Sequence, residues 1–170
     1  MANLERGAAG QELLRSDDPA DGGLDVWHVD DNRAYSNILS RALNLTPGIK
    51  CSQQFASAPP LFFALETLPP PHVILLDFKM PGMTGVEALP RIRQLAPNTV
   101  VLMLTTYPER AVEEAALAAG AKGFLEKNEP LINILEAIRK AKASVPPART
   151  APTPPVPGRA VAGVSFNAKA

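Results

Sequence analysis

The stretch that decides the fold is His72-Val-Ile-Leu-Leu-Asp77-Phe-Lys-Met-Pro-Gly-Met-Thr-Gly85. It begins with a continuous apolar run that stops at the carboxylate of Asp77. A short run without alternation of apolar and polar residues is typical of a strand that is buried on both faces of a sheet. The Pro-Gly pair at 81–82 favours a turn soon after the strand. The stretch therefore predicts a central strand that carries an acidic group to the edge of a sheet.

Outward from this stretch, strand-length runs alternate with stretches of helical length. We expect strands at Leu24–Val29, Ile49–Phe55, His72–Leu76, Thr99–Leu104 and Ala121–Leu125. We expect helices at Arg33–Leu45, Ala58–Leu68, Gly85–Leu95, Pro108–Ala119 and Glu129–Ala143. Strands that alternate with helices form right-handed βαβ units, and such units build a parallel sheet with helices on both faces. The predicted fold class is therefore α/β, a doubly wound parallel sheet.

The prolines mark the limits of this domain. The chain has 18 of them, and the segment 145–158 is especially rich in proline. Because proline fixes φ and lacks a backbone donor, neither helix nor central strand is expected there. Residues 1–23 also lack a periodic apolar pattern. The sequence thus predicts a folded domain at 24–144, with disordered tails at 1–23 and 145–170.

Charge and composition exclude several classes of protein. The chain has 17 basic and 17 acidic residues, so no excess of positive charge favours nucleic acid or an anionic membrane as a partner. Cys51 is the single cysteine, which rules out an intrachain disulfide. No apolar run approaches the length of a transmembrane helix, and the N-terminus lacks the pattern of a signal peptide. These features predict a cytoplasmic protein.

Chemically useful side chains follow the predicted strands. Asp30 and Asp31 follow the first strand, Asp77 the third, Thr105 the fourth and Lys127 the fifth. In an open parallel sheet, binding sites lie outside the carboxyl ends of the strands, so these groups are expected at one edge. Clustered carboxylates repel one another unless a cation joins them, and oxygen ligands suit Mg²⁺. With an amine and a hydroxyl beside them, they predict a site for a phosphoryl group, in which one carboxylate serves as the nucleophile.

The chain resembles the receiver domain of two-component response regulators. The matching motifs are Val29-Asp-Asp-Asn32, Ile74-Leu-Leu-Asp77-Phe-Lys-Met-Pro-Gly-Met-Thr-Gly85, Leu104-Thr105 and Ala119-Gly-Ala-Lys-Gly-Phe-Leu-Glu-Lys127. In the residues that surround the matched positions, these motifs are most similar to those of receivers that precede a helix-turn-helix output domain. The resemblance implies a flavodoxin-like sheet of five parallel strands in the order 2-1-3-4-5 with five helices.

The resemblance also implies a role for each matched residue. Asp77 is the phosphoacceptor, which takes a phosphoryl group from a sensor histidine kinase or a histidine phosphotransfer protein. Mg²⁺ is bound by Asp31 and Asp77 and by the backbone carbonyl of Lys79, with Asp30 holding a metal-bound water or the metal itself.

Three further roles concern the phosphoryl group and the response to it. Lys127 pairs with the phosphoryl group, Thr105 shifts to hydrogen-bond it, and Phe124 occupies the aromatic switch position. No turnover of a small substrate is expected, so the chain is not an enzyme in that sense.

Some of these residues also have a simpler interpretation. Asp30 and Asp31 could cap the helix that follows them, and Phe124 could serve packing alone. His28 is interpreted as a hydrogen-bonded core histidine rather than a ligand.

Several functions remain open at this point. The first is a stand-alone receiver that signals through protein contacts, and the alternative is the receiver part of a DNA-binding regulator whose output domain is absent from this chain. In either case this chain itself is expected to bind no nucleic acid and no membrane. A homodimer through the first and last helices, with Leu39 and Ile132 exposed, is a further possibility.

A hydrolase with Asp77 as its nucleophile is disfavoured, because Lys79 stands where phosphatases of the haloacid dehalogenase type carry a second Asp. Electron transfer by a flavodoxin-like protein is disfavoured because the Asp pair would repel an FMN phosphate.

Overall fold

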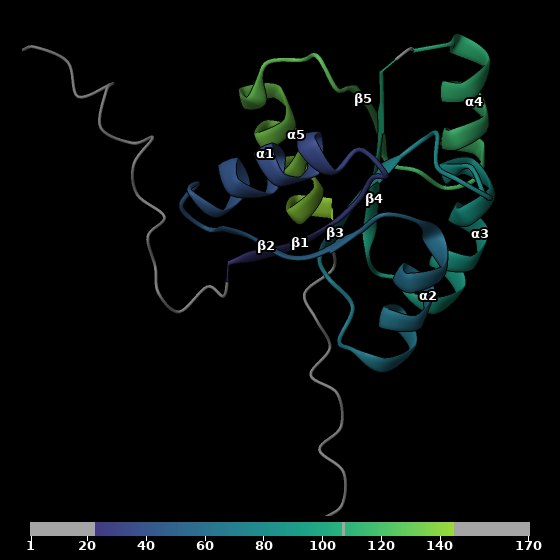
Figure 1. Cartoon of the computed structure of the whole chain (residues 1–170), viewed down its shortest axis with the longest axis horizontal. Coiled ribbons are helices and arrows are strands. Elements are labelled where there is room, and N and C mark those ends of the chain that lie inside the picture. Colours follow the sequence, from purple (N-terminus) through teal and green to yellow (C-terminus); the bar gives the residue numbers. More distant parts are fainter. Residues whose placement is uncertain (1–22, 107, 145–170) are drawn as a thin grey trace, which may run out of the picture.

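The computed structural model describes residues 23–106 and 108–144, which form a five-stranded parallel sheet with five helices (Figure 1). The strands lie in the order β2-β1-β3-β4-β5, which confirms the predicted class and strand order. They are β1 (Leu24–Val29), β2 (Ile49–Phe55), β3 (Val73–Asp77), β4 (Val100–Thr105) and β5 (Gly123–Glu126). The helices are α1 (Arg33–Asn44), α2 (Ala58–Thr67), α3 (Gly85–Leu95), α4 (Arg110–Ala118) and α5 (Leu131–Ser144). The predicted tails fall outside the described residues, apart from Gly23.

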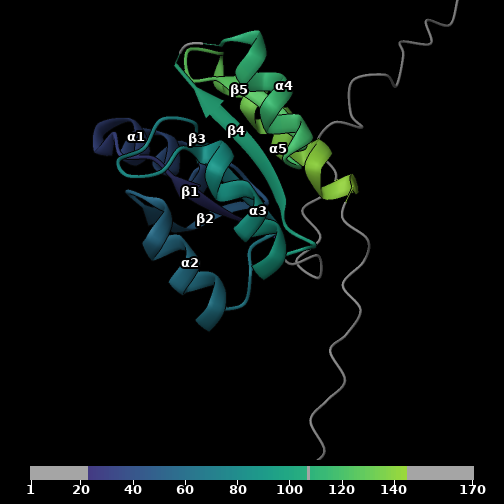
Figure 2. The same cartoon turned by 90° about the vertical axis from the view of Figure 1, so that its right-hand side faces the viewer.

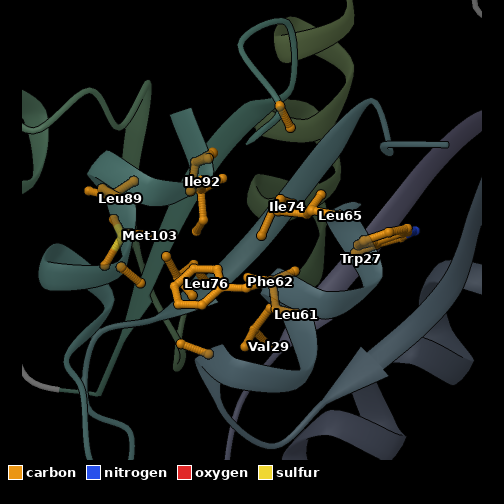
Figure 3. Packing of buried hydrophobic residues seen from close by; sticks show 14 of the residues in the cluster. Trp27, Val29, Leu61, Phe62, Leu65, Ile74, Leu76, Leu89, Ile92 and Met103 are labelled. Atoms are coloured by element: carbon orange, nitrogen blue, oxygen red, sulfur yellow. The ribbon is translucent and has the colours of Figure 1, made fainter. Parts of the chain in front are cut away.

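The helices form a layer on each face of the sheet. Helices α2, α3 and α4 cover one face, and α1 and α5 cover the other, as the two views show (Figures 1 and 2). Each layer has its own core cluster, and successive residues of a strand contribute to opposite clusters. Leu76 and Met103, for example, pack with Phe62 of α2 and Leu89 of α3 (Figure 3). The sheet is therefore buried on both sides, as its apolar strands predict.

The two central strands are more deeply buried than the strand at the β5 edge. Every residue of β3 and β4 is buried, whereas every residue of β5 is only half-buried. Asp77 and Thr105 prove to be the last residues of their strands rather than the first residues beyond them. Asp77 is paired in register with Leu104, so the carboxyl ends of the two strands lie side by side.

The loop after β3 is held tightly against the strand. Gly82 has φ +80°, a left-handed conformation that glycine adopts without strain. At Gly85, an added Cβ would lie 2.3 Å from the backbone oxygen of Asp77, so only glycine allows this close approach. The Thr84 hydroxyl and the Glu87 carboxylate form a capping box at the start of α3. These features fix the backbone between β3 and α3, which forms one wall of the cavity described below.

One sequence-based expectation about the surface is wrong. Leu39 was expected to be exposed as part of a dimer face, but it is buried, with 4% of its surface accessible. It lies on the inward stripe of α1, one turn before the fully buried Leu43. Ile132 on α5 is exposed, as expected.

Among the residues that the structure describes, no helix combines the length and the apolar character needed to cross a membrane.

Candidate functional site

The acidic and basic residues predicted from the strand ends come together at one edge of the sheet. Lys127, which follows β5, places its Nζ 2.7 Å from Oδ2 of Asp30 and 3.0 Å from Oδ2 of Asp77. Asp30 and Asp77 are both buried, and the Lys127 side chain is only 11% exposed. The lysine thus joins the ends of three strands through two ion pairs.

The pKa values of the two buried carboxyl groups shift in opposite directions. Burial raises the pKa of Asp77 above its ordinary value, although its contacts with Lys127 and with the backbone of Lys79 act against this shift. Burial also favours a raised pKa at Asp30, but the interactions of its carboxylate with His28, Lys127 and the backbone N–H of Asn32 outweigh this effect and lower the pKa. Asp30 is therefore the more firmly ionised of the two.

Asp31 completes the acidic group from the solvent side. It is exposed, and one carboxylate oxygen from each of Asp30, Asp31 and Asp77 lies within 4.8 Å of the others. A set of carboxylate oxygens is the donor set that Mg²⁺ uses in proteins, usually together with water. The residues present therefore fit a magnesium ion, with Asp31 open to the solvent from which the ion would arrive.

The Asp pair does not serve as the helix cap. The N-cap of α1 is Asn32, whose side chain accepts a hydrogen bond from the Tyr35 N–H at 3.1 Å. Oδ1 of Asp30 instead accepts from the Asn32 N–H at 2.9 Å. This bond fixes one oxygen of the buried carboxylate and leaves Oδ2 to face Lys127.

A cavity of about 670 Å³ opens beside these residues. Its walls come from the loops after β1, β3 and β4 and include Asp31, Asp77, Lys79, Thr105 and Lys127. Lys79 is exposed at the rim. The carboxylate of Asp77, Thr105 and Lys127, which were predicted from the sequence to form one site, thus line one space that is large enough for a phosphoryl group.

Thr105 and Phe124 occupy different positions relative to this cavity. Thr105 is buried at the end of β4, and its carbonyl accepts the backbone N–H of Lys127 at 2.7 Å, which ties β4 to the lysine. Phe124 lies on β5 in register with Met103 and packs, half-buried, against the core on the α4 side. Phe124 does not line the cavity.

Two residues near the site were not predicted to belong to it. The Tyr35 ring lies 5.2 Å from Nζ of Lys127, and burial together with Asp30 and Asp77 raises its pKa to about 12. His28 is fully buried, with Nε2 3.6 Å from Oδ2 of Asp30. A signal for His28 was present in the sequence, because residues two apart in a strand share a face and His28 precedes Asp30 by two.

Comparisons with known proteins agree with this geometry. Residues 26–139 match the model of the response regulator receiver domain. The chain is 32% identical over 114 residues to the response regulator GacA of Pseudomonas protegens, covering 67% of this chain and 53% of GacA. It is 34% identical over 102 residues to the DNA-binding transcriptional regulator NtrC of Klebsiella pneumoniae, covering 60% of this chain and 21% of NtrC. The chain thus spans about half the length of GacA, and a smaller share of NtrC.

Solved structures show the same relationship. The response regulator domain of Thermotoga maritima CheB superposes with a TM-score of 0.66 at 29% identity, covering 73% of this chain and 99% of that domain. Because the family model matches more than half of the chain, this chain belongs to the response regulator receiver domain family.

Proposed function

We propose that Asp77 accepts a phosphoryl group from a phosphohistidine on a sensor histidine kinase or a histidine phosphotransfer protein. The observation that carries this proposal is the bridge of Lys127 between Asp30 and Asp77 at the wall of the cavity. A carboxylate oxygen of Asp77 attacks the phosphorus, the bond from phosphorus to the imidazole nitrogen breaks, and the electron pair returns to the imidazole. The phosphoryl group then resides on Asp77 as an acyl phosphate.

The cation and the lysine have separate tasks in this proposal. Asp30, Asp31, Asp77 and the backbone carbonyl of Lys79 would hold Mg²⁺, which when bound neutralises charge on the phosphoryl oxygens. Lys127 already carries a positive charge at the wall of the cavity and would pair with the transferred group. Since Asp77 is buried against Asp30, neutralisation of the site also favours the ionised form of the nucleophile.

The response to phosphorylation is proposed to travel toward α4 and β5. The new group brings a charge of about −1.5 to −2 at neutral pH. The Thr105 hydroxyl would move to hydrogen-bond it, and Phe124 would turn inward into the space that this opens. The face formed by α4, β5 and α5 would then present an altered surface to a downstream protein in the cytoplasm.

Acceptance of the phosphoryl group is tested with acetyl phosphate and Mg²⁺, read by intact mass. Wild-type protein is expected to gain one phosphoryl group, Asp77→Asn none, and Asp31→Asn little. Asp25→Asn is the control, because Asp25 lies near the N-terminal end of β1, whereas Asp30 and Asp31 follow its C-terminal end. This variant should be labelled like wild type. Unlabelled wild-type protein, or a label that maps to another residue, would contradict the proposal.

The cation is tested separately through thermal stability. A ligand that binds only the folded state stabilises it by RT ln(1 + [L]/Kd), about 2.7 kcal/mol when the ligand is at a hundredfold excess over Kd. Millimolar Mg²⁺ should therefore raise the Tm of wild-type protein, and Asp31→Asn should abolish the rise. A Tm that does not respond to Mg²⁺ in wild type would refute the site.

A second candidate is the receiver part of a DNA-binding regulator. It is supported by the similarity to NtrC, which is named as a DNA-binding transcriptional regulator and is longer than the matched part. The coding sequence beyond Ala170 decides between this candidate and a receiver that acts alone. A helix-turn-helix region encoded there would favour the DNA-binding regulator.

Homodimerisation stays a proposal, and it now rests on other residues. With Leu39 buried, the large exposed apolar side chains described on these two helices are Ile38 of α1 and Leu131 and Ile132 of α5. Light scattering with and without phosphorylation would show whether the chain dimerises, and Ile132→Ser should weaken a dimer that uses α5.

A further inference from the structure

A line of hydrogen-bonding side chains connects the acidic edge, through His28, to the exposed Gln54 on β2. Its Nδ1 lies 3.1 Å from the Ser36 hydroxyl on α1, and this hydroxyl lies 3.0 Å from the side-chain oxygen of Gln54 on β2. Its Nε2 faces Oδ2 of Asp30 at 3.6 Å. His28 and Ser36 are buried, whereas Gln54 is exposed. The line therefore runs from solvent to a carboxylate of the site.

The direction of the hydrogen bonds along this line decides what His28 offers to Asp30. If the Ser36 hydroxyl donates to Gln54, its only proton is used, and Nδ1 of His28 must carry a proton to donate to Ser36. In a neutral ring, Nε2 then presents a lone pair to the Asp30 carboxylate. Two acceptors would face each other in a buried site, which is unfavourable.

If the hydrogen bonds run in the opposite direction, from Gln54 to Ser36 and from Ser36 to His28, both ring nitrogens of His28 have suitable partners. The amide of Gln54 can turn over within the same space, so that its NH₂ donates to Ser36. Ser36 then donates to Nδ1, and the proton of the ring resides on Nε2, where it points to Asp30. Nε2 of His28 is buried without a hydrogen-bond partner, whereas Oδ2 of Asp30 already lies 2.7 Å from Nζ of Lys127. A small rotation of the imidazole or the carboxylate would bring Nε2 and Oδ2 from 3.6 Å to hydrogen-bonding length. This bond would satisfy Nε2 and would give Oδ2 a second donor beside Lys127.

We propose that His28 is a positioning residue, held by Gln54 and Ser36 with a proton on Nε2, which donates to Asp30 and holds its carboxylate in place for the divalent cation. The inference rests on the proposed function, because it presumes that the cation binds at this edge. Oδ1 of Asp30 accepts from the Asn32 N–H, and Oδ2 pairs with Lys127. His28 would add a second, buried donor to Oδ2 and so restrain the carboxylate further. Groups that orient a metal-binding side chain in this way typically change metal affinity by about 10- to 100-fold.

The proton position is tested first on wild-type protein. Nitrogen-15 NMR of the histidine rings distinguishes a proton on Nε2 from one on Nδ1. The chain has two histidines, so the signal that disappears in His28→Leu belongs to His28, and His72→Gln identifies it without changing the core. A proton on Nε2 and none on Nδ1 is the expected result. A proton on Nδ1 would overturn the inference, because Ser36 could then not donate to that nitrogen.

Titration calorimetry with Mg²⁺ alone then tests the effect on the site. His28→Leu should weaken binding by about tenfold, whereas His28→Gln, which keeps an N–H donor near the same position, should recover most of the loss. A purely structural histidine would instead lower the Tm of His28→Leu and leave the Mg²⁺ affinity of the folded protein unchanged.

Gln54→Glu keeps the experiment decisive even if His28→Leu does not fold. Glutamate cannot donate, so Ser36 must donate to it and the ring proton moves to Nδ1. Weaker Mg²⁺ binding is expected, although the added negative charge by itself would strengthen it. Gln53→Glu is the matched control, because it adds the same charge at the next residue, whose side chain points to the opposite face of the strand.

The possible failures are distinguishable. Absence of Mg²⁺ binding in wild type would overturn the proposed cation site. Wild-type affinity in both His28→Leu and Gln54→Glu, with wild-type binding intact, would overturn the role of His28 alone. Equal weakening in Gln53→Glu and Gln54→Glu would also overturn it, because the loss would then not depend on the contact with Ser36.

Discussion

The unit of β3 and α3 differs from the unit of α4 and β5 in how firmly its backbone is held. All five residues of β3 are buried, and α3 begins with a capping box. Helix α4 has no side-chain hydrogen bond at its N-cap, Glu109, and of its residues only Ala116 is buried. Strand β5 has four residues, all half-buried. The first unit carries Asp77, whereas the second leads to Lys127 and carries Phe124.

The difference indicates which part of the molecule can respond to a change at the site. A displacement of β3 would disturb contacts with helices on both faces of the sheet, and each buried side chain lost from such contacts costs free energy. A displacement of α4 or β5 would disturb fewer buried contacts. A new charge on Asp77 is therefore expected to leave β3 in place and to be accommodated by α4 and β5.

The largest expected contrast is between two leucines. Leu76 of β3 is fully buried, whereas Leu125 of β5 is half-buried. Leu76→Ala should lower the free energy of unfolding by about 2–5 kcal/mol, because it removes a buried side chain and leaves a cavity. Leu125→Ala should cost clearly less, since part of that side chain already contacts solvent. Urea denaturation measures both, and equal losses would show that β5 is held as firmly as β3.

The sequence was sufficient to predict the architecture and to predict that Asp30, Asp77 and Lys127 lie together, but for different reasons. Apolar runs such as 73–76 predicted the buried strands because a sheet covered on both faces leaves little choice of residue. The boundaries were less certain at polar ends, so Asp77 and Thr105 were expected just beyond their strands but end them. Asp30, Asp77 and Lys127 could be placed at one edge because parallel strands share a direction.

The finer contacts could not be predicted, because they depend on how separate elements pack. The double ion pair of Lys127 requires the position of β5 beside β4, far along the chain from Asp30. The pattern of α1 did not identify Leu39 as an inward-facing residue, since an isolated leucine on a helix is common on protein surfaces as well. The approach of His28 to Asp30 follows the strand period, but its partner Ser36 comes from another element.

A smaller contrast is expected between the two helix starts. Thr84 accepts a hydrogen bond from the Glu87 N–H in the capping box of α3, whereas Glu109 makes no such bond for α4. Thr84→Ala should cost about 1 kcal/mol, the usual loss when an N-cap is removed. Glu109→Ala should stay within about 0.5 kcal/mol of wild type. Thermal unfolding of both variants checks this, and a loss at Glu109 as large as that at Thr84 would show that α4 is anchored by contacts other than its cap.

The smallest effect concerns the charge in the same capping box. The backbone N–H and the hydroxyl of Thr84 both donate to Oε2 of Glu87 at 2.8 Å, and these bonds lower the pKa of Glu87 below its ordinary 4.5. A lowered pKa in the folded state means that the ionised carboxylate contributes stability, fully above pH 4.5 and progressively less as the pH falls through the folded value. Glu87→Gln should therefore be slightly less stable than wild type at pH 7, and the difference should shrink toward zero in acid.

Glu113→Gln provides the control for this prediction, because Glu113 lies in the first turn of α4, where the N-cap side chain forms no hydrogen bond. Unfolding is measured from pH 3 to pH 7 for wild type and both variants. Equal stability of wild type and Glu87→Gln from pH 3 to pH 7 would mean that the amide and the carboxylate serve the box equally well. In that case the firmness of the β3–α3 unit would come from the Thr84 hydroxyl and the packing of Gly85 against Asp77, and the charge of Glu87 would add nothing to it.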